Sequence, residues 1–209
     1  MVAHKINPQK TALLVFDMIN EFIKPGFAGY TPGIRENLVP PLKKLIEHCR
    51  SKDIPVIYAC HVHREDGSDF GLLPEILRGL KERKRFISGT ESPEVYDEIK
   101  PQEGDIVVEK RRFSAFYGTD LELILRGMGK DTLIITGFAT NIGCESTARD
   151  AVDMDFRVIF PSDGNGVRDL PDMGWGPIPG EEIQRVFLST LARSFARVLT
   201  IEELISELQ

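Results

Sequence analysis

Short apolar runs alternate with longer segments of helical spacing along nearly the whole chain. The runs at 11–16 (TALLVF) and 132–136 (TLIIT) are rich in β-branched residues and predict buried strands. Over 38–52 the apolar residues recur every three or four positions, which is typical of a helix. The same reading predicts strands at 11–16, 54–60, 105–109, 132–136, 156–160 and 197–200. It predicts helices at 38–52, 119–128, 144–154, 181–194 and 201–208.

The order of these elements predicts the fold class. Apolar strands without alternation are buried on both faces, and strands separated by helices are joined by right-handed crossovers in a parallel sheet. We therefore expect an α/β fold of three α/β/α layers with a six-stranded, mainly parallel sheet. The segments 22–34 and 167–179 are rich in Gly and Pro but also carry aromatic residues. Such loops usually cover a site or a subunit contact.

Composition and charge exclude several classes of protein. The chain has 209 residues, 42% of them hydrophobic, and a formal net charge of −6, which predicts one domain spanning 1–209. The acidic balance and the lack of a basic run exclude a nucleic-acid partner. No stretch approaches the roughly 18 consecutive apolar residues of a membrane span, and the N-terminal segment lacks the apolar core of a signal peptide. We therefore expect a cytoplasmic protein.

Three cysteines, at positions 49, 60 and 144, are too sparse and irregular for a disulfide framework. Cys144 lies shortly after the fourth predicted strand, Asp17 follows the first strand and Lys110 follows the third. Parallel sheets place their sites at these carboxyl ends. Each residue also has an ordinary interpretation: Asp17 as a turn cap, Lys110 as an exposed strand end, and Cys144 as an inert buried thiol. Cys49 and Cys60 fit that last interpretation.

Together the three side chains suit nucleophilic catalysis. A turn before a helix exposes Cys144 to the positive end of the helix dipole, which favours the thiolate and lowers the thiol pKa. Lys110 supplies a cation that stabilises the thiolate. Asp17 supplies an acid/base group that takes the thiol proton and returns it to the leaving group. The sequence thus predicts a Cys-Lys-Asp catalytic triad without a catalytic His.

The motifs that carry these residues resemble those of the isochorismatase-like cysteine hydrolases. They are VFDMINEF at 15–22, EKRRFSAF at 109–116 and GFATNIGCESTARDA at 137–151, and the resemblance spans nearly the whole chain in the same order. It implies an isochorismatase-like sheet with the first strand beside the fourth, so that Asp17 and Cys144 face each other near Lys110. It also implies a cis peptide between Ala139 and Thr140, and an oxyanion hole formed by the N–H groups of Thr140 and Cys144.

The resemblance also narrows the expected reaction. Isochorismatases that cleave a vinyl ether generally lack the nucleophilic Cys, so Cys144 indicates hydrolysis of a carbamoyl, ureido or carboxamide C–N bond through a thioester, with release of ammonia. The segment 111–116 is most similar to N-carbamoylsarcosine amidases and ureidoacrylate amidohydrolases. The loop over 25–33 has neither His nor Asp, unlike the metal-dependent nicotinamidases of the family, and we expect no metal and no cofactor. A nicotinamidase, a vinyl-ether hydrolase and a catalytically silent binding protein remain alternatives.

Further residues are candidates for contact with a small-molecule substrate. His61 and His63 stand two positions apart on a strand, which aims both rings at one face and permits a metal pair. Because no third ligand follows at a zinc-site spacing, a pocket or interface position is the favoured interpretation. The family and the apolar loops indicate a homo-oligomer, a dimer or a tetramer. Candidate pocket walls, each also interpretable as a core or interface residue, are Phe22, Arg112, Phe116, Tyr117 and Trp175.

Overall fold

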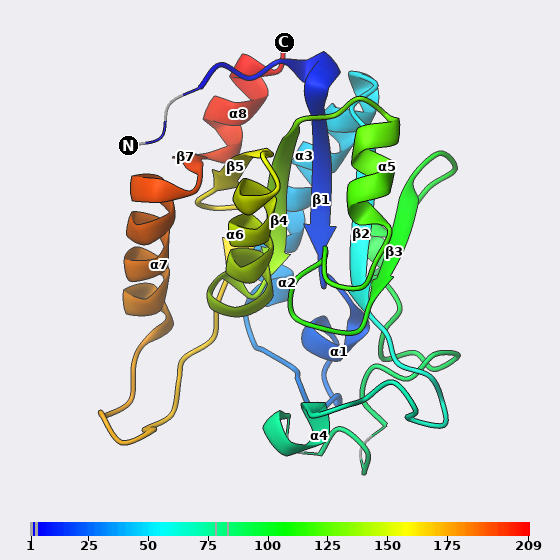
Figure 1. Cartoon of the computed structure of the whole chain (residues 1–209). Helices are drawn as coiled ribbons and strands as arrows, with labels where there is room; N and C mark the ends of the chain where they lie inside the picture. The colour runs from blue at the N-terminus through cyan, green and yellow to red at the C-terminus, as the bar shows by residue number, and fades with distance from the viewer. Residues whose placement is uncertain (1, 3, 78, 83) are drawn as a thin grey trace.

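The centre of the protein is a parallel sheet with six principal strands, seen in a computed structural model that describes residues 2, 4–77, 79–82 and 84–209 (Figure 1). The strand order is β3-β2-β1-β4-β5-β7, and a two-residue strand, β6 (Asn165–Gly166), pairs with the end of β4. The predicted α/β class and six-stranded parallel sheet are confirmed. The principal strands are β1 (Thr11–Phe16), β2 (Val56–His61), β3 (Ile106–Lys110), β4 (Thr132–Phe138), β5 (Arg157–Pro161) and β7 (Arg197–Leu199).

Helices cover both faces of the sheet and complete the three layers (Figure 1). On one face, α3 (Val39–Ser51) and α8 (Ile201–Glu207) contribute buried residues to one core cluster. The helices of the other face contribute to a second cluster. These are α5 (Leu121–Gly127), α6 (Glu145–Asp153) and α7 (Gly180–Ser194). The predicted helices and strands end within two residues of the observed ones. Within the described part of the chain, none of the helices has the length and apolarity needed to cross a membrane.

Several short elements were not predicted, because each is too brief to show a hydrophobic period. Most of them lie beyond the carboxyl ends of the strands, where loops between β2 and β3 also gather (Figure 1). They are α1 (Asn20–Ile23), α2 (Ile34–Asn37), α4 (Leu73–Ile76), the 3-10 turns Pro8–Lys10 and Asp97–Ile99, and the π-helical turn Thr140–Cys144. This clustering places irregular backbone around the edge at which the sequence predicts the site.

Strands β1 and β4 lie side by side at the point where the strand order reverses. Phe16 is in register with Gly137, and a Cβ atom on Gly137 would lie 2.0 Å from the Phe16 carbonyl oxygen. Gly137 also has a φ of 123°, a conformation that side chains disfavour. Only glycine therefore allows the two strands to end side by side, which sets the residues after β1 and β4 next to each other.

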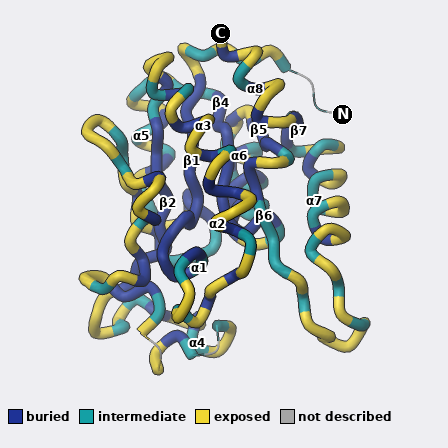
Figure 2. The backbone as a smooth tube through the Cα atoms, turned by 180° about the vertical axis from the view of Figure 1, so that it is seen from behind, coloured by how far each residue is buried: buried dark blue, intermediate teal, exposed yellow. Residues whose placement is uncertain are grey.

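The segment 167–179 forms an arm that projects from the body of the protein beside α7. Its two legs are joined by an antiparallel bridge between Leu170 and Ile178. Figure 2 shows that the arm and the outer face of α7 are largely exposed, in contrast to the buried sheet. At the arm, Met173 is 70% and Trp175 90% exposed. The loop that the sequence singles out therefore presents its large apolar side chains to the surroundings.

Candidate active site

Asp17 and Lys110 form a buried ion pair at the carboxyl edge of the sheet. Lys110 Nζ donates a hydrogen bond to Asp17 Oδ2 at 2.7 Å, and the backbone N–H of His61 donates to Asp17 Oδ1 at 2.8 Å. Lys110 is 1% exposed, and its Nζ lies 4.3 Å from the ring centre of Phe16. The structure thus brings together two of the three side chains that the sequence places at this edge.

The surroundings of Asp17 favour the uptake of a proton. Its backbone φ is 47°, a left-handed conformation uncommon for residues other than glycine. Burial raises the pKa of the Asp17 carboxyl above its ordinary value, while the charge and hydrogen bond of Lys110 and the N–H of His61 act in the opposite direction. A carboxylate with a raised pKa is a stronger base than a carboxylate on the surface. Asp17 is therefore suited to accept a proton from a nearby thiol or water.

Cys144 lies at the junction of the π-helical turn and α6, and it is fully buried. Burial raises the pKa of its thiol well above the ordinary value, the charge of Asp17 adds to this rise, and Lys110 opposes it. The expectation of a lowered pKa is wrong, because removal of a thiolate from water outweighs the favourable helix N-terminus. Cys144 is thus a protonated thiol at neutral pH, close enough to Asp17 and Lys110 for both charges to act on it.

In the turn after β4, the cis peptide bond lies one residue earlier than expected. The cis peptide bond joins Phe138 and Ala139 rather than Ala139 and Thr140, since β4 extends to Phe138 and the chain leaves the sheet there. The Cys144 N–H, expected in an oxyanion hole, donates to the Ala139 carbonyl at 3.2 Å. The Thr140 hydroxyl is buried without a hydrogen-bond partner in the described part of the protein. An oxyanion would have to displace the Ala139 carbonyl from the Cys144 N–H.

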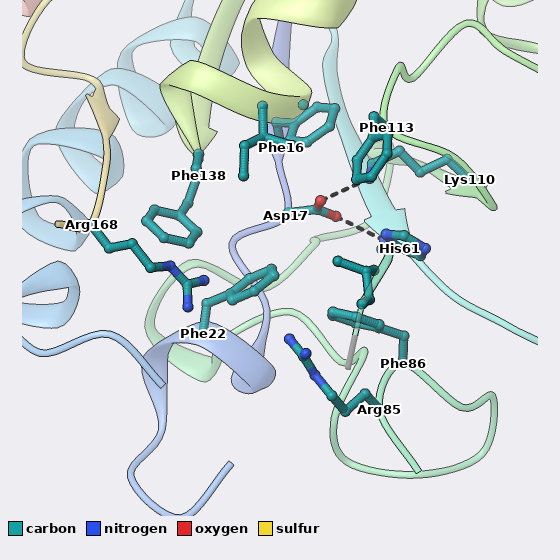
Figure 3. A pocket seen from close by; sticks show the side chains of 14 residues that line it. Phe16, Asp17, Phe22, His61, Arg85, Phe86, Lys110, Phe113, Phe138 and Arg168 are labelled. Atoms are coloured by element: carbon teal, nitrogen blue, oxygen red, sulfur yellow. Dashed lines mark hydrogen bonds and ion pairs between the residues drawn. The ribbon is translucent and has the colours of Figure 1, made fainter. Parts of the chain in front are cut away.

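A cavity of about 230 Å³ opens beside the ion pair. Asp17, Lys110 and His61 line one side, and the guanidinium groups of Arg85 and Arg168 approach from the opposite side (Figure 3). The cavity stops short of Cys144, which the neighbouring turn covers. A small apolar cavity with a few convergent charged groups is typical of a small-molecule site. The other lining residues are Phe16, Phe22, Leu77, Phe86, Phe113, Phe138, Ala139, Ile142 and Gly143.

Of the five predicted pocket walls, only Phe22 lines this cavity. Phe116 belongs to the core on the other face of the sheet, where its ring packs 5.7 Å from that of Phe156. Tyr117 and Trp175 are 67% and 90% exposed. For these residues the prediction is wrong, because closeness to a motif in the sequence does not fix the face to which a side chain turns.

Arg112 was also predicted to line the pocket, and it does not line this cavity. Its Nη1 donates to the backbone carbonyls of Asp69 and Arg111, at 3.1 and 2.6 Å. Its side chain is occupied in holding the loop after β2 against the segment after β3, and it does not line the cavity. Arg112 thus has a structural role, and the arginines that line the cavity come from elsewhere in the chain.

Arg85 and Arg168, the arginines among the described residues of the cavity, were not predicted from the sequence. Arg85 is fixed in place, because its Nε donates to Glu21 Oε1 at 2.6 Å. Glu21 is 1% exposed and also accepts hydrogen bonds from the Ser92 hydroxyl and the Gly29 N–H. This network ties the loop after α1 to the segment before β3. No pattern in the sequence predicts this hydrogen-bond network, because its members are far apart in the chain.

Arg168 is half-buried and lacks a carboxylate partner among the residues that the structure describes. Its guanidinium lies 5.7 Å from the ring centre of Phe22 and 5.2 Å from that of Phe138. Burial lowers the pKa of Arg168, and the neighbouring charge of Arg85 acts in the same direction. Arg168 lies in the Gly- and Pro-rich segment 167–179. The prediction for this segment rested on its aromatic residues and did not include Arg168.

His61 lines the cavity, and His63 does not. Their Nε2 atoms are 2.9 Å apart, a hydrogen-bond distance. His63 Nδ1 lies 3.1 Å from Asp69 Oδ1. Among the described residues, no group of three or more His, Cys, Asp or Glu side chains is placed to hold a metal ion. The paired histidines are engaged with each other and with a carboxylate.

Comparison with known proteins reveals relatives in sequence and in structure. A profile of the isochorismatase domain matches residues 11–203. The chain is 35% identical over 161 residues to N-carbamoylsarcosine amidase from Arthrobacter sp., a match that covers 76% of this chain and 60% of that protein. The chain thus spans less than two thirds of the length of this relative.

Two solved structures share the fold. A cysteine hydrolase from Pseudomonas syringae pv. phaseolicola has a TM-score of 0.95 at 36% identity, covering 99% of this chain and 96% of that one. N-carbamoylsarcosine amidase from Thermoplasma acidophilum has a TM-score of 0.70 at 33% identity, covering 92% and 96%. Both similarities extend over more than nine tenths of the chain.

Proposed function

The chain belongs to the isochorismatase family of hydrolases, and from this premise we propose that it is a cysteine-dependent amidohydrolase. It cleaves a carbamoyl, ureido or carboxamide C–N bond of a small molecule and releases ammonia. The observation that carries this proposal is the buried Asp17–Lys110 ion pair, which lines the cavity and is close enough to the fully buried Cys144 for both charges to act on its thiol. Such an arrangement supplies a base, a cation and a nucleophile out of contact with bulk water.

In the proposed mechanism, Asp17 takes the proton from Cys144 Sγ as the sulfur attacks the substrate carbonyl carbon. Lys110 stabilises the negative charge that moves from carboxylate to thiolate to oxyanion. The C–N bond then breaks, and Asp17 delivers the proton to the departing nitrogen, which leaves as ammonia. Water, deprotonated by Asp17, hydrolyses the thioester and restores the thiol. The backbone N–H groups of Thr140 and Cys144 are the proposed oxyanion donors, each worth about 10²–10³ in rate.

The high thiol pKa makes the base essential to this mechanism. A cysteine with a low pKa attacks as a preformed thiolate, but burial keeps Cys144 protonated. Proton transfer to Asp17 must therefore accompany substrate binding. Binding must also open the turn over 142–144, since Ile142 and Gly143 line the cavity and Cys144 lies behind them. Substrate binding and nucleophile exposure are coupled in this scheme.

The charged residues of the cavity indicate the substrate class. Arg168 lacks a counter-ion among the described residues, whereas the neighbouring Arg85 is already paired with Glu21. Arginine pairs well with carboxylates. We propose that the substrate is a small carbamoyl or ureido acid whose carboxylate contacts Arg168, while its carbamoyl group lies near Asp17 and Lys110. The similar Arthrobacter protein is named for N-carbamoylsarcosine, which is a compound of this class.

Ammonia release tests the proposal. The wild-type protein would be given N-carbamoyl amino acids, ureido acids, nicotinamide, biuret and isochorismate, with Cys144→Ser and the matched control Cys49→Ser. Cys49 is equally buried, but it lies in α3 away from the cavity. We expect turnover of the carbamoyl or ureido acids, lost in Cys144→Ser and retained in Cys49→Ser. Retained turnover in Cys144→Ser, or cleavage of isochorismate alone, would contradict the covalent mechanism.

A further inference from the structure

A chain of hydrogen bonds leads from the cavity to the edge of the protein. His61 Nε2 pairs with His63 Nε2 at 2.9 Å, and His63 Nδ1 pairs with Asp69 Oδ1 at 3.1 Å. The Asp69 carboxylate also accepts from Arg111 Nε at 2.7 Å and from the backbone N–H of Arg64 at 3.2 Å. The proposed mechanism uses none of these side chains, yet one end of the chain is a wall of the cavity.

The chemistry of the chain fixes the position of each proton. An ionised carboxylate only accepts hydrogen bonds, so His63 must donate to Asp69 from Nδ1. Burial lowers the pKa of both histidines, which are therefore neutral and carry one ring proton each. The Nε2 of His63 is then an acceptor, and His61 must donate to it from its own Nε2. This leaves the Nδ1 of His61 as an unprotonated nitrogen with a free lone pair.

The ring of His61 is held in a single place. It stacks on Phe86 with ring centres 4.6 Å apart and an interplanar angle of 15°. Its backbone N–H donates a hydrogen bond to Asp17, and both residues line the same cavity. The residue is 4% exposed, and it lines the cavity. Its Nδ1 makes no hydrogen bond to another described residue.

We infer that His61 is a specificity-determining residue whose Nδ1 accepts a hydrogen bond from an N–H of the substrate's carbamoyl or carboxamide group. His63 and Asp69 are positioning residues that hold this lone pair toward the cavity. The inference rests on the proposed amidohydrolase function and extends it. Among the described residues of the cavity, Lys110, Arg85 and Arg168 offer only donors. Each Asp17 oxygen already accepts a hydrogen bond, one from Lys110 and one from the His61 N–H. An acceptor beside Asp17 therefore favours an amide or ureide, which has N–H groups, over an ester of the same acid, which has none at that position.

Asp69→Asn is the decisive variant, because it should reverse the hydrogen bonds of both histidine rings. Arg111 Nε can only donate, so the Asn oxygen must take the place of Oδ2 and the Asn NH2 group the place of Oδ1. The NH2 group then donates to His63 Nδ1, His63 donates from Nε2, and His61 carries its proton on Nδ1. The cavity then presents a donor in place of an acceptor. Asp66→Asn is the matched control: it removes the same charge from the same loop. Among the described residues, Asp66 accepts hydrogen bonds from Ser68, in its own turn, and takes no part in the histidine chain.

Two measurements test whether the protonated ring nitrogens of His61 and His63 are exchanged in Asp69→Asn. Nitrogen-15 chemical shifts of the histidine rings in the substrate-free protein should show the proton on Nε2 of His61 and Nδ1 of His63 in the wild type and Asp66→Asn. In Asp69→Asn the two positions should be exchanged. In parallel, the ratio of kcat/KM for an amide to that for the matching ester should fall about 10- to 100-fold in Asp69→Asn, the effect of one mispaired buried polar group. The control should keep the wild-type ratio.

Substitution of His61 provides a second readout. In His61→Asn the Oδ1 atom can take the place of Nδ1, so this variant should retain much of the amide preference. His61→Phe keeps a ring to pack on Phe86 but loses the acceptor, and it should lower the amide-to-ester ratio as Asp69→Asn does. Equal ratios in His61→Asn and His61→Phe would overturn the inference, and so would a wild-type His61 that carries its proton on Nδ1.

The two proposals fail in different ways. If the wild-type protein hydrolyses no amide, the amidohydrolase proposal is wrong, and the ring-nitrogen shifts still report the polarity of His61. If amides are hydrolysed and the tautomers are as expected, but Asp69→Asn keeps the wild-type amide-to-ester ratio, the substrate contact of His61 is wrong and the proposed function stands.

Discussion

The pKa values of Asp17 and Cys144 differ from those of an Asp or Cys on the surface, because both side chains are removed from water. Burial raises the pKa of each, and for both groups a higher pKa means a more strongly held proton. One buried cation, Lys110, opposes both shifts. The chemistry of the proposed triad is thus a balance between desolvation and a single ammonium group. Removal of that ammonium should change both activity and stability.

Lys110→Met should raise the pKa of Asp17 further and move the acidic limb of the kcat/KM profile to higher pH, because Asp17 must be ionised to act as a base. Loss of one partner from a buried ion pair should also lower the free energy of unfolding at neutral pH by about 3–5 kcal/mol. Lys24→Met is the control: Lys24 Nζ lies 2.7 Å from Glu91, but this pair is exposed, and its loss should lower the free energy of unfolding far less.

The wild-type protein should also lose the Asp17 contribution to stability as pH rises. The folded-state pKa of Asp17 lies above the 3.8 of the unfolded chain, so in this window the folded state binds the proton more tightly. Its stabilising contribution is then present below pH 3.8 and decreases as pH rises from 3.8 through the raised value. Urea titrations of wild type and Asp17→Asn across this window measure the difference. A difference that grows with pH in favour of the wild type would contradict the assigned direction.

Arg168→Met should separate binding from folding. Loss of the guanidinium should raise KM about 10- to 100-fold for substrates that carry a carboxylate and leave an uncharged amide nearly unaffected. Because Arg168 is a half-buried cation without a carboxylate partner in the described chain, the melting temperature should stay the same or rise. Arg185→Met, which changes an exposed arginine of α7, is the control for KM. An equal rise in KM for charged and uncharged substrates would refute the carboxylate contact.

At the scale of the elements, the strand ends position the site. The register of β1 with β4 and of β2 with β3 sets Asp17, His61 and Lys110 at one edge of the sheet, and the π-helical turn after β4 brings in Cys144. Rigid strands hold side chains more exactly than loops do. This arrangement depends on Gly137, because only glycine allows β1 and β4 to approach each other so closely at that point.

Gly137→Ala should therefore be among the most damaging single substitutions. The added methyl group would lie 2.0 Å from a β1 carbonyl oxygen in a backbone with a φ of 123°, and the strain and the overlap should each cost about 1–3 kcal/mol. Gly104→Ala separates the two terms, since Gly104 has a φ of 93° but open space around it. Chemical denaturation should show a clearly larger loss for Gly137→Ala. Equal losses would mean that the contact between the strands is relaxed.

The sequence predicts the elements far better than it predicts the pocket. Strand and helix positions follow from hydrophobic periodicity, which is local, and Asp17 and Lys110 follow from their places at strand ends. Arg85 and Arg168 reach the cavity through loops, and Glu21, which fixes Arg85, is 64 residues away in sequence. The protonated state of Cys144 was missed because burial, a property of the assembled fold, decides its pKa.

At the scale of the whole molecule, the arm over 167–179 stands out because it projects from the body of the protein and exposes large apolar side chains. Trp175 and Met173 are exposed at the arm, and Val186 of the helix that follows it, α7, is 47% exposed. Large apolar side chains on a projecting arm are costly in water and are typical of protein contacts. We expect the arm to pack on a second copy of this chain, in keeping with the expected homo-oligomer. The same arm carries Arg168 at its base, so association would also order the cavity.

Trp175→Ser should then weaken self-association. We expect the wild-type protein to sediment as a dimer or tetramer at micromolar concentration, and the variant to dissociate at concentrations at which the wild type stays assembled. Tyr117→Ser removes another exposed aromatic side chain, away from the arm, and should leave the assembly intact. A wild-type protein that sediments as a monomer would disprove the expected contact.

The burial of Cys144 has one more consequence, which concerns oxidative damage. Peroxides oxidise exposed thiolates, first to the sulfenic acid and then irreversibly. Cys144 is fully buried, and its raised pKa keeps it protonated, so the resting protein offers an oxidant neither a charge nor a path to the sulfur. In the proposed mechanism, the thiolate forms only when a substrate occupies the cavity and blocks that path. We therefore expect Cys144 of the resting protein to resist oxidation by peroxide, and its reactivity to be reserved for the molecule that opens the turn.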